Sequence, residues 1–285
     1  MKGFIEAVKY ELTPMFAGYS IEEVEVVKMN DRKLHGLAFK RDGVDYAPTV
    51  CLDDAYESFM NDEVKFNQIV NDVHRMILRA EFTDNIDTTE ILGNVEDKLS
   101  LRMIDMRKNE EFLKTVPFKR VENGVTLALV ADVVNGEGRA VVTDDMLEYL
   151  KISDKAVMDT AISNCRDDAV LRDVADAMFG TGKNFLLEDK AEGFMFVLTN
   201  KSGIFGAVSM AFLETRKRVA ELLGEFYALP SSVHEWIILP KSRGLDIDEL
   251  KAMVASANCT VVDDEDVLSD GVYFVDKDGR LEEAA

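Results

Sequence analysis

Apolar positions in the first part of the chain follow two spacings, and each spacing predicts one type of element. Residues 24–29 and 34–39 are rich in β-branched and aromatic side chains, and the polar residues 30–33 between them predict the turn of a β-hairpin. Residues 47–52 predict a third short strand. From about residue 63 to residue 80 the apolar positions take helical spacing, which predicts an amphipathic helix. Its apolar side consists of Phe66, Ile69, Val70, Val73 and Ile77.

Polar side chains that can cap a helix mark where several helices begin. Thr143, Ser153 and Asp246 each stand directly before a stretch with helical spacing. Asp53 or Asp54 does the same after the third strand, and Glu57 follows Asp54 at the spacing of a capping box. The start of the chain predicts one more helix, whose apolar face is formed by Phe4, Ile5, Val8 and Leu12.

Both spacings recur in the rest of the chain. The most apolar stretch, residues 125–134, predicts a central strand. The residues after 276 are expected to fray. A helix is expected to carry Val170, Leu171, Val174 and Met178. Further strands are expected at residues 98–106, 117–134, 139–142, 194–199, 204–210, 226–229, 233–239 and 272–276.

Hairpins and capped helices without a regular βαβ alternation predict an α+β fold, in which antiparallel or mixed sheets carry amphipathic helices. The length of 285 residues favours two units. We expect an N-terminal α+β domain at residues 1–115 and a C-terminal α+β domain at residues 116–285. No Pro- or Gly-rich linker marks the boundary, which we place before Pro117.

The charge excludes two classes of partner and favours a third. The chain has 54 acidic and 33 basic residues, so its formal net charge is −21. Binding to nucleic acid or to an anionic membrane needs a basic surface, and we expect neither. The basic run Arg216-Lys217-Arg218 fits the solvated face of a helix better than a phosphate site. A basic protein is the partner that this charge favours.

Several absences bear on compartment and cofactors. No apolar run approaches the ~18 residues of a membrane helix, and acidic residues interrupt the N-terminal pattern where a signal peptide would be apolar. The three cysteines are odd in number and form no CxxC pair, which suits reduced thiols in a cytoplasmic protein. The three histidines show no i, i+4 pair. We expect no metal and no cofactor.

The stretch from Pro230 to Trp236 gathers more chemistry than any other. It holds two hydroxyls, Ser231 and Ser232, the imidazole of His234 and the carboxylate of Glu235. One hypothesis is a hydrolase, with His234 as general base and one of the two serines as nucleophile. The favoured alternative is a structural turn, because the serines lie too close to His234 along the chain for the usual arrangement. In that case the serines cap backbone amides and His234 bonds to a carbonyl.

A second polar turn, residues 200–203, lies between two expected strands. Asn200 and Ser202 would join the Pro230 stretch in a small-ligand site if those strands are neighbours. Gly180-Thr181-Gly182-Lys183 resembles a phosphate loop but lacks its other residues. Ala177 stands where the first glycine is needed and Asn184 where Ser or Thr is needed.

Four segments together resemble a known family. They are residues 47–57, 198–203, 229–235 and 267–273, and Pro-Ser-Ser-Val-His-Glu at 230–235 is the most specific of them. In order and spacing they resemble domain-of-unknown-function family 5688, an uncharacterised bacterial family. The resemblance implies a cytoplasmic protein of bacterial or phage-borne origin, and it assigns no activity, cofactor or catalytic residue.

The function hypothesis favoured by these observations is a non-enzymatic interaction or regulatory protein with a basic protein partner. The alternative is the hydrolase at residues 230–235. The two differ in what they expect of His234, which is a packed structural group in the first and a catalytic base facing a pocket in the second.

Overall fold

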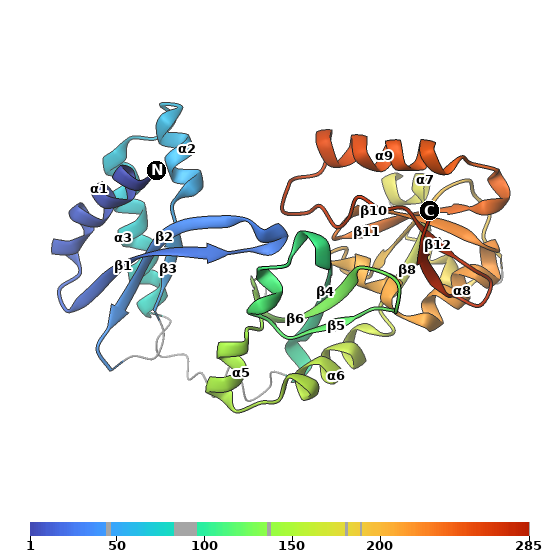
Figure 1. Ribbon diagram of the computed structural model, residues 1–285, viewed down its shortest axis with the longest axis horizontal. Helices are drawn as coiled ribbons and strands as arrows, with labels where there is room; N and C mark the ends of the chain where they lie inside the picture. Colours follow the sequence, from blue (N-terminus) through green and yellow to red (C-terminus); the bar gives the residue numbers. More distant parts are fainter. Residues whose placement is uncertain (44–46, 83–95, 136–137, 180–181, 189, 285) are drawn as a thin grey trace. The chain divides into compact units, whose positions relative to one another are not determined.

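A computed structural model describes residues 1–43, 47–82, 96–135, 138–179, 182–188 and 190–284. The chain divides into two compact units, Met1–Gly93 and Asn94–Ala285. Unit 1 has one sheet and unit 2 has two (Figure 1). Each unit has its own cluster of buried hydrophobic residues. Gly180 and Thr181, which belong to the segment that resembles a phosphate loop, lie outside the described residues.

Unit 1 is a three-stranded antiparallel sheet with helices packed against it. The strand order is β1-β2-β3, and the β1–β2 hairpin pairs from Tyr19↔Arg41 to Val27↔Lys33. The elements are α1 (Lys2–Leu12), β1 (Tyr19–Val27), β2 (Lys33–Arg41), β3 (Thr49–Cys51), α2 (Asp53–Met60) and α3 (Phe66–Phe82).

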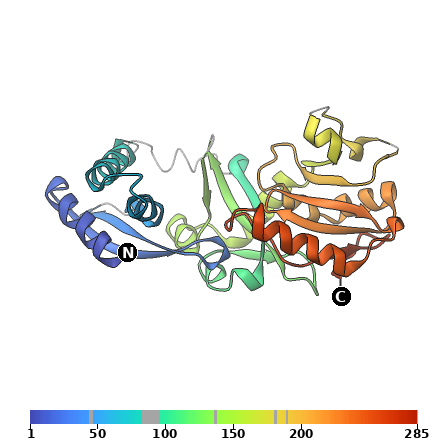
Figure 2. The ribbon, with the colours of Figure 1, turned by 90° about the horizontal axis from the view of Figure 1, so that it is seen from above.

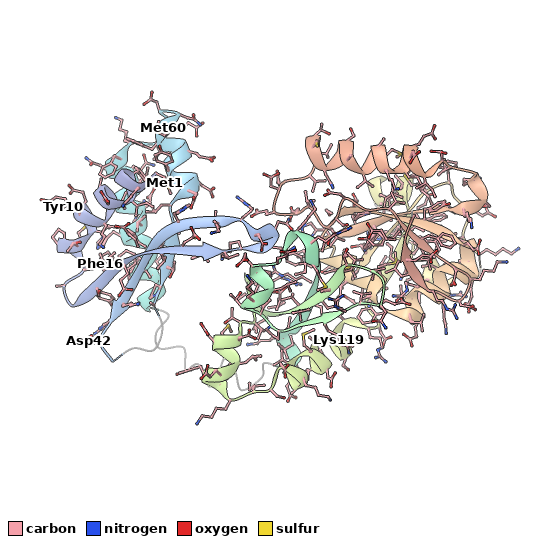
Figure 3. All side chains as sticks on the ribbon, in the orientation of Figure 1. Met1, Tyr10, Phe16, Asp42, Met60 and Lys119 are labelled. Carbon is pink, nitrogen blue, oxygen red and sulfur yellow. The ribbon has the colours of Figure 1, made fainter. Side chains whose placement is uncertain are left out.

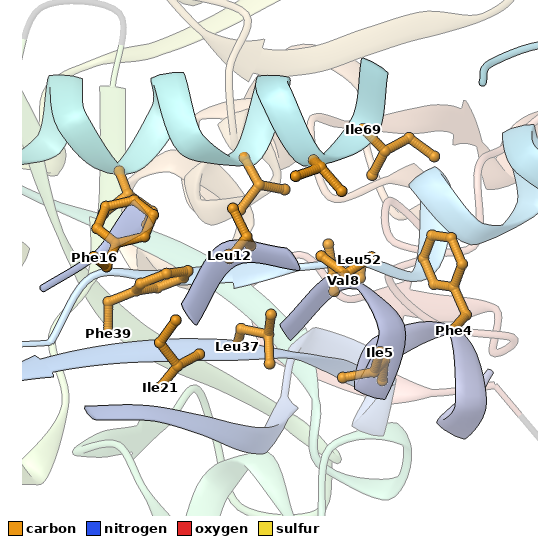
Figure 4. Packing of buried hydrophobic residues seen from close by; sticks show 13 residues of the cluster. Phe4, Ile5, Val8, Leu12, Phe16, Ile21, Leu37, Phe39, Leu52 and Ile69 are labelled. Atoms are coloured by element: carbon orange, nitrogen blue, oxygen red, sulfur yellow. The ribbon is translucent and has the colours of Figure 1, made fainter. Parts of the chain in front are cut away.

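The core of unit 1 confirms the helical spacing seen in the sequence. Side chains of α1 and β2 point toward α3 (Figure 4), and Phe16 packs edge-on against Phe39 with ring centroids 4.9 Å apart. The residues expected on the apolar side of α3 are buried, apart from Phe66, which is partly buried against the cluster. The fully buried members of the core are Val8, Leu12, Leu37, Phe39 and Leu52.

The first sheet of unit 2 is built around β6. β6 (Leu127–Asn135) pairs with β4 (Leu99–Asp105) along its length, and with the short strands β5 (Phe118–Arg120) and β7 (Gly138–Val141). The central strand expected at residues 125–134 is therefore confirmed. α6 (Asp154–Cys165) packs on this sheet and follows α5 (Asp144–Leu150); Ser153 and Thr143 cap them as expected.

The second sheet of unit 2 has six antiparallel strands in the order β13-β12-β10-β11-β9-β8. α9 (Ile247–Thr260), which Asp246 caps as expected, covers one face, and Figures 1 and 2 both draw it alongside β10 and β11. On the opposite face Trp236 is fully buried and donates its indole N–H to the carbonyl of Ala207 at 2.8 Å. The strands are β8 (Ala169–Asp173), β9 (Phe196–Asn200), β10 (Phe226–Ser232), β11 (Glu235–Pro240), β12 (Tyr273–Val275) and β13 (Leu281–Glu283).

The α+β fold class is confirmed, whereas three expected elements are wrong. Residues 204–210 form the 3-10 helix η8 (Gly206–Ala211) in place of a strand, and residues 281–283 pair as β13 where the tail was expected to fray. The helix expected to carry Val170 is strand β8 followed by α7 (Val174–Phe179). Val170 and Leu171 are buried through pairing with β9, and this long-range contact outweighs their helical spacing.

The division of the chain falls at Gly93, whereas the sequence placed a boundary near residue 115. A boundary at 115 would separate β4 from β6, although the two strands pair over seven residues from Leu99↔Val133 to Asp105↔Leu127. Sheet pairing therefore joins residues 99–105 to unit 2.

Two further expectations about charged side chains are wrong. α2 has Leu52 at its N-cap and no side-chain cap, because the carboxylate of Asp53 instead accepts the backbone N–H of His35 at 2.7 Å. Arg216, expected on a solvated face of α8 (Leu213–Leu223), is buried and donates to the carbonyls of Met210 and Gly279.

Within the described residues, no helix is both long enough and apolar enough to cross a membrane.

Candidate functional site

The two polar turns singled out in the sequence lie side by side in unit 2. β9 and β11 are neighbours, with Trp236 opposite Leu198. The hydroxyl of Thr199 donates to the carbonyl of His234 at 2.8 Å. Gly206 fits between the turns only because it lacks a side chain, since an added Cβ would lie 2.7 Å from the same carbonyl. The turns around Asn200 and His234 therefore form one cluster.

His234 stands at the tip of the β10–β11 hairpin. β10 continues through Pro230 to Ser232 with a bulge, so the expected loop at 230–232 is strand and the tip is Val233-His234. The ring Nδ1 accepts the backbone N–H of Phe205 at 2.9 Å. An Nδ1 that accepts leaves the ring proton on Nε2, which faces Oδ1 of Asp266 at 3.4 Å. The ring also packs on that of Phe205, with centroids 5.3 Å apart.

The two serines bond away from the imidazole. Ser232 Oγ accepts the backbone N–H of His234 at 3.0 Å, and Ser231 Oγ donates to Oε1 of Glu235 at 3.5 Å. Among the described contacts, neither hydroxyl reaches a ring nitrogen of His234. Ser232 thus caps a backbone amide, as the structural alternative expects, while the ring bonds to an amide rather than to a carbonyl.

Asn200 and Ser202 hold their own turn together. Asn200 Nδ2 donates to the carbonyl of Ile204 at 2.9 Å, and Ser202 Oγ donates to Oδ1 of Asn200 at 3.0 Å. The backbone N–H of Ile204 donates in turn to Ser202 Oγ at 3.2 Å. Both side chains are therefore engaged by the turn that leads into Phe205.

Phe205 explains why so many groups converge here. Its φ is +51°, a left-handed conformation that is strained for a bulky residue. His234 bonds its amide and packs on its ring, while the guanidinium of Arg102 lies 4.4 Å from the ring centroid and that of Arg139 lies 5.0 Å from it. Tertiary contacts of this kind hold a strained backbone in place.

A buried ion pair fixes these arginines. Arg102 binds the carboxylate of Asp132 through Nε at 2.9 Å and Nη2 at 2.8 Å, and the Asp132 side chain is 0% exposed. Burial raises the pKa of the Asp132 carboxyl, and the charges of Arg102 and Arg139 act against that rise. The ring of Phe205 thus contacts both His234 and the Arg102–Asp132 ion pair. The polar groups of this cluster bond to other groups of the protein.

A second region, which the sequence did not single out, is concave. It is a hollow of about 420 Å³, within the range of about 300–1,000 Å³ that small-molecule sites occupy. We call it the basic hollow, and its lining residues are Met106, Arg107, Glu110, Leu113, Lys114, Phe118, Arg120 and Thr126.

Among the side chains that line the basic hollow, cations outnumber carboxylates, in contrast to the chain as a whole. Its lining holds three cationic side chains and one carboxylate, that of Glu110. Residues 98–120 contain seven Lys and Arg against three Asp and Glu, a local excess of four positive charges in a chain of net charge −21. The positive charge of residues 98–120 could have indicated this site from the sequence. The net charge of the whole chain hides it.

Unit 1 has a smaller grouping around His35. Its Nδ1 lies 3.2 Å from Oδ1 of Asp53, and its Nε2 lies 3.7 Å from Oε2 of Glu25, at a hollow of about 440 Å³. A hydrogen bond from Lys33 lowers the pKa of Glu25. Within the described residues, no group of three or more His, Cys, Asp or Glu side chains could hold a metal ion.

Comparison with known proteins gives one match. A model described as "Family of unknown function (DUF5688)" matches residues 1–277. Neither the curated proteins nor the solved structures include a match.

Proposed function

The chain belongs to the family of unknown function DUF5688, and we propose from the geometry of the described residues that it is a non-enzymatic interaction or regulatory protein. The family is the one that the segments at 47–57, 198–203, 229–235 and 267–273 resemble. Its description carries no activity, so the proposal rests on the arrangement around His234.

One observation carries the proposal. Nδ1 of His234 accepts a backbone N–H and Nε2 faces a carboxylate, so both ring nitrogens are engaged. A general base needs a free nitrogen within reach of the nucleophile's hydroxyl, at about 2.6–3.2 Å. Ser231 and Ser232 bond elsewhere. The geometry therefore supports a structural hairpin tip more than a Ser–His hydrolase.

The partner we propose is a basic protein, and α5 is the surface we propose for it. α5 exposes Asp144, Asp145 and Glu148, and no ion pair engages these carboxylates within the described residues. Tyr149 beside them is 59% exposed, and tyrosine is enriched at protein interfaces. Three free carboxylates next to an exposed aromatic ring suit a lysine- or arginine-rich surface.

The test compares two triple variants that lose the same charge. In the first, Asp144→Asn, Asp145→Asn and Glu148→Gln neutralise α5. In the second, Glu6→Gln, Glu11→Gln and Glu57→Gln neutralise exposed positions of unit 1. We expect wild type and the second variant to retain one basic protein from extracts of the source cell at low salt, and the first variant to lose it. Retention of no partner by wild type, or equal retention by both variants, contradicts the proposal.

The hydrolase alternative has its own readout. A fluorophosphonate probe labels a serine only when a base activates it. We expect no labelling of Ser231 or Ser232 in the purified wild-type protein. Labelling that Ser231→Ala or Ser232→Ala abolishes, and that His234→Ala also abolishes, would overturn the non-enzymatic proposal in favour of a hydrolase.

A further inference from the structure

We propose that the basic hollow binds a small organic anion, namely an apolar body that carries a carboxylate or phosphate group. This site goes beyond the protein interaction proposed above and does not depend on it. The hollow lies where β5 and the start of β6 meet the 3-10 helices η5 (Met106–Lys108) and η6 (Phe112–Lys114). Its lining combines apolar and cationic side chains, which is the combination that such a ligand needs.

Strand β5 supplies the two side chains that define the ligand class. Successive side chains of a strand point to opposite faces, so Phe118 and Arg120 share the face that lines the hollow. Phe118 is 41% exposed, so its ring is accessible to a ligand. A flat apolar group stacked on this ring would be held beside the Arg120 guanidinium.

Arg120 is the cation that is free to bind. Within the described residues its side chain makes no hydrogen bond and no ion pair. A guanidinium offers paired N–H groups whose geometry matches a carboxylate or a phosphate. In a chain with 54 acidic residues, an unpaired arginine beside an exposed ring leaves a place for an external anion.

The other two cations have different parts. Arg107 is fixed by Asp105, through Nη2 at 2.8 Å, and by Glu283, through Nη1 at 3.0 Å; the hydrogen bonds to these acids raise its pKa. It therefore provides a rigid wall of the hollow. Within the part of the chain that the structure describes, Lys114 pairs only with Glu111, and both side chains are more than half exposed. Exposed pairs of this kind contribute little, so Lys114 can turn to a ligand at small cost.

The test uses small probes and a matched pair of variants. The probes are phenyl phosphate and phenylacetate, with phenylethanol as the uncharged analogue and inorganic phosphate as the anion without an apolar body. The variants are Arg120→Gln and Lys119→Gln. Lys119 is the neighbouring residue on β5, it does not line the hollow, and Figure 3 labels it. Both variants remove one exposed positive charge from the same edge strand.

We expect saturable binding of both organic anions by the full chain in calorimetric titration, with a Kd of about 1 mM or lower. Arg120→Gln should raise that Kd about tenfold, and Lys119→Gln should leave it within about twofold, as expected for a loss of general charge attraction. Phenylethanol and inorganic phosphate should each bind more weakly than phenyl phosphate. Far-ultraviolet circular dichroism checks that both variants are folded.

Three results would overturn the site. The first is an absence of saturable binding to wild type by either organic anion. The second is an equal loss of affinity in Arg120→Gln and Lys119→Gln, which indicates general charge attraction. The third is inorganic phosphate that binds as tightly as phenyl phosphate, because Phe118 would then take no part.

Discussion

The hairpin tip at His234 and the basic hollow beside β5 differ in how completely their polar groups are engaged, although Arg107 and Lys114 at the hollow are ion-paired. At the tip, the hydroxyls, the amide and the imidazole form bonds with one another and with the backbone of residues 204–205. At the hollow, the Arg120 guanidinium and the Thr126 hydroxyl have no partner within the described residues. Polar groups crowded along the sequence thus stabilise a turn, whereas unengaged groups remain where separate elements meet.

The two regions differ because only the tip has to stabilise a strained backbone conformation. The tip keeps Phe205 in a left-handed conformation, and a strained backbone persists only when surrounding contacts determine it. The hollow lies beside a three-residue edge strand whose residues are all exposed, so nothing in the fold requires its side chains to be paired. We therefore interpret the hydrogen-bonded groups of the tip as structural and the unpaired groups of the hollow as available to a ligand.

The largest expected effect comes from the ion pair behind Phe205. Asp132→Ala leaves Arg102 and Arg139, which are 11% and 17% exposed, without their carboxylate. Loss of one partner of a buried pair should lower the free energy of unfolding by about 3–5 kcal/mol. Urea denaturation measures it. Asp159→Ala, which removes an exposed partner of Lys155, is the control and should leave the midpoint unchanged. Equal midpoints for both variants would show that the pair behind Phe205 is not structural.

His234→Ala tests the tip itself. The substitution leaves the amide of Phe205 without its acceptor and should lower the free energy of unfolding by about 1–3 kcal/mol. A thermal melt of the purified variant shows this as a lower midpoint. A midpoint equal to or above that of wild type would contradict the structural role and favour a catalytic one.

Tyr273 connects the two regions and gives a pH dependence. It packs edge-on against Trp236, and its hydroxyl bonds Ser269, which donates to Asp105, the partner of Arg107. Burial raises its pKa to about 12, against about 10 in an unfolded chain. The unfolded state therefore releases this proton first, and stability should fall as the pH rises from about 10 to about 12.

Tyr273→Phe checks this dependence. The variant should show a shallower loss of stability over the same alkaline range, because it has no phenol to ionise. Urea denaturation at several pH values measures the slope for both proteins. Identical slopes for wild type and variant would mean that Tyr273 is not protected by the fold.

The smallest expected effects come from the same type of substitution, threonine to valine, made once in each region. Thr199→Val removes a hydroxyl that donates to the carbonyl of His234 and should lower stability by about 1 kcal/mol. Thr126→Val removes a buried hydroxyl that has no partner among the described residues and should raise stability by up to about 1 kcal/mol. Changes of the same sign in urea denaturation would break the distinction between engaged and unengaged groups.

The elements that the sequence predicted well depend on local spacing. The apolar face of α3, the central strand β6 and the caps at Thr143, Ser153 and Asp246 follow from residues within a few positions of one another. Such signals require no knowledge of the rest of the fold.

The elements that the sequence missed depend on distant contacts. η8 stands where a strand was expected, and its Gly206 lies against Thr199 and the carbonyl of His234. Asp53 bonds His35, 18 residues away, and does not cap α2. Arg216 is buried because Glu122 and the carbonyl of Gly279 reach it from other elements. Spacing along the chain contains none of this information.

The candidate site was missed for a related reason. The chemistry at residues 230–235 was visible in the sequence, and the neighbouring strands do bring Asn200 beside it. The basic hollow, in contrast, combines residues 106–126 from three kinds of element. The local positive charge of these residues was present in the sequence. The hollow that brings their side chains together appears only in the folded structure.

The affinity of phenyl phosphate for His234→Ala and for Arg120→Gln, measured in the same calorimetric titration, tests the central claim most directly. We predict that His234→Ala binds the anion as wild type does, because its stability loss of about 1–3 kcal/mol leaves a domain of about 5–15 kcal/mol folded at 25 °C. Arg120→Gln should bind it about tenfold more weakly. The reverse result, with binding lost in His234→Ala and retained in Arg120→Gln, would place the functional site at the hairpin tip and contradict this account.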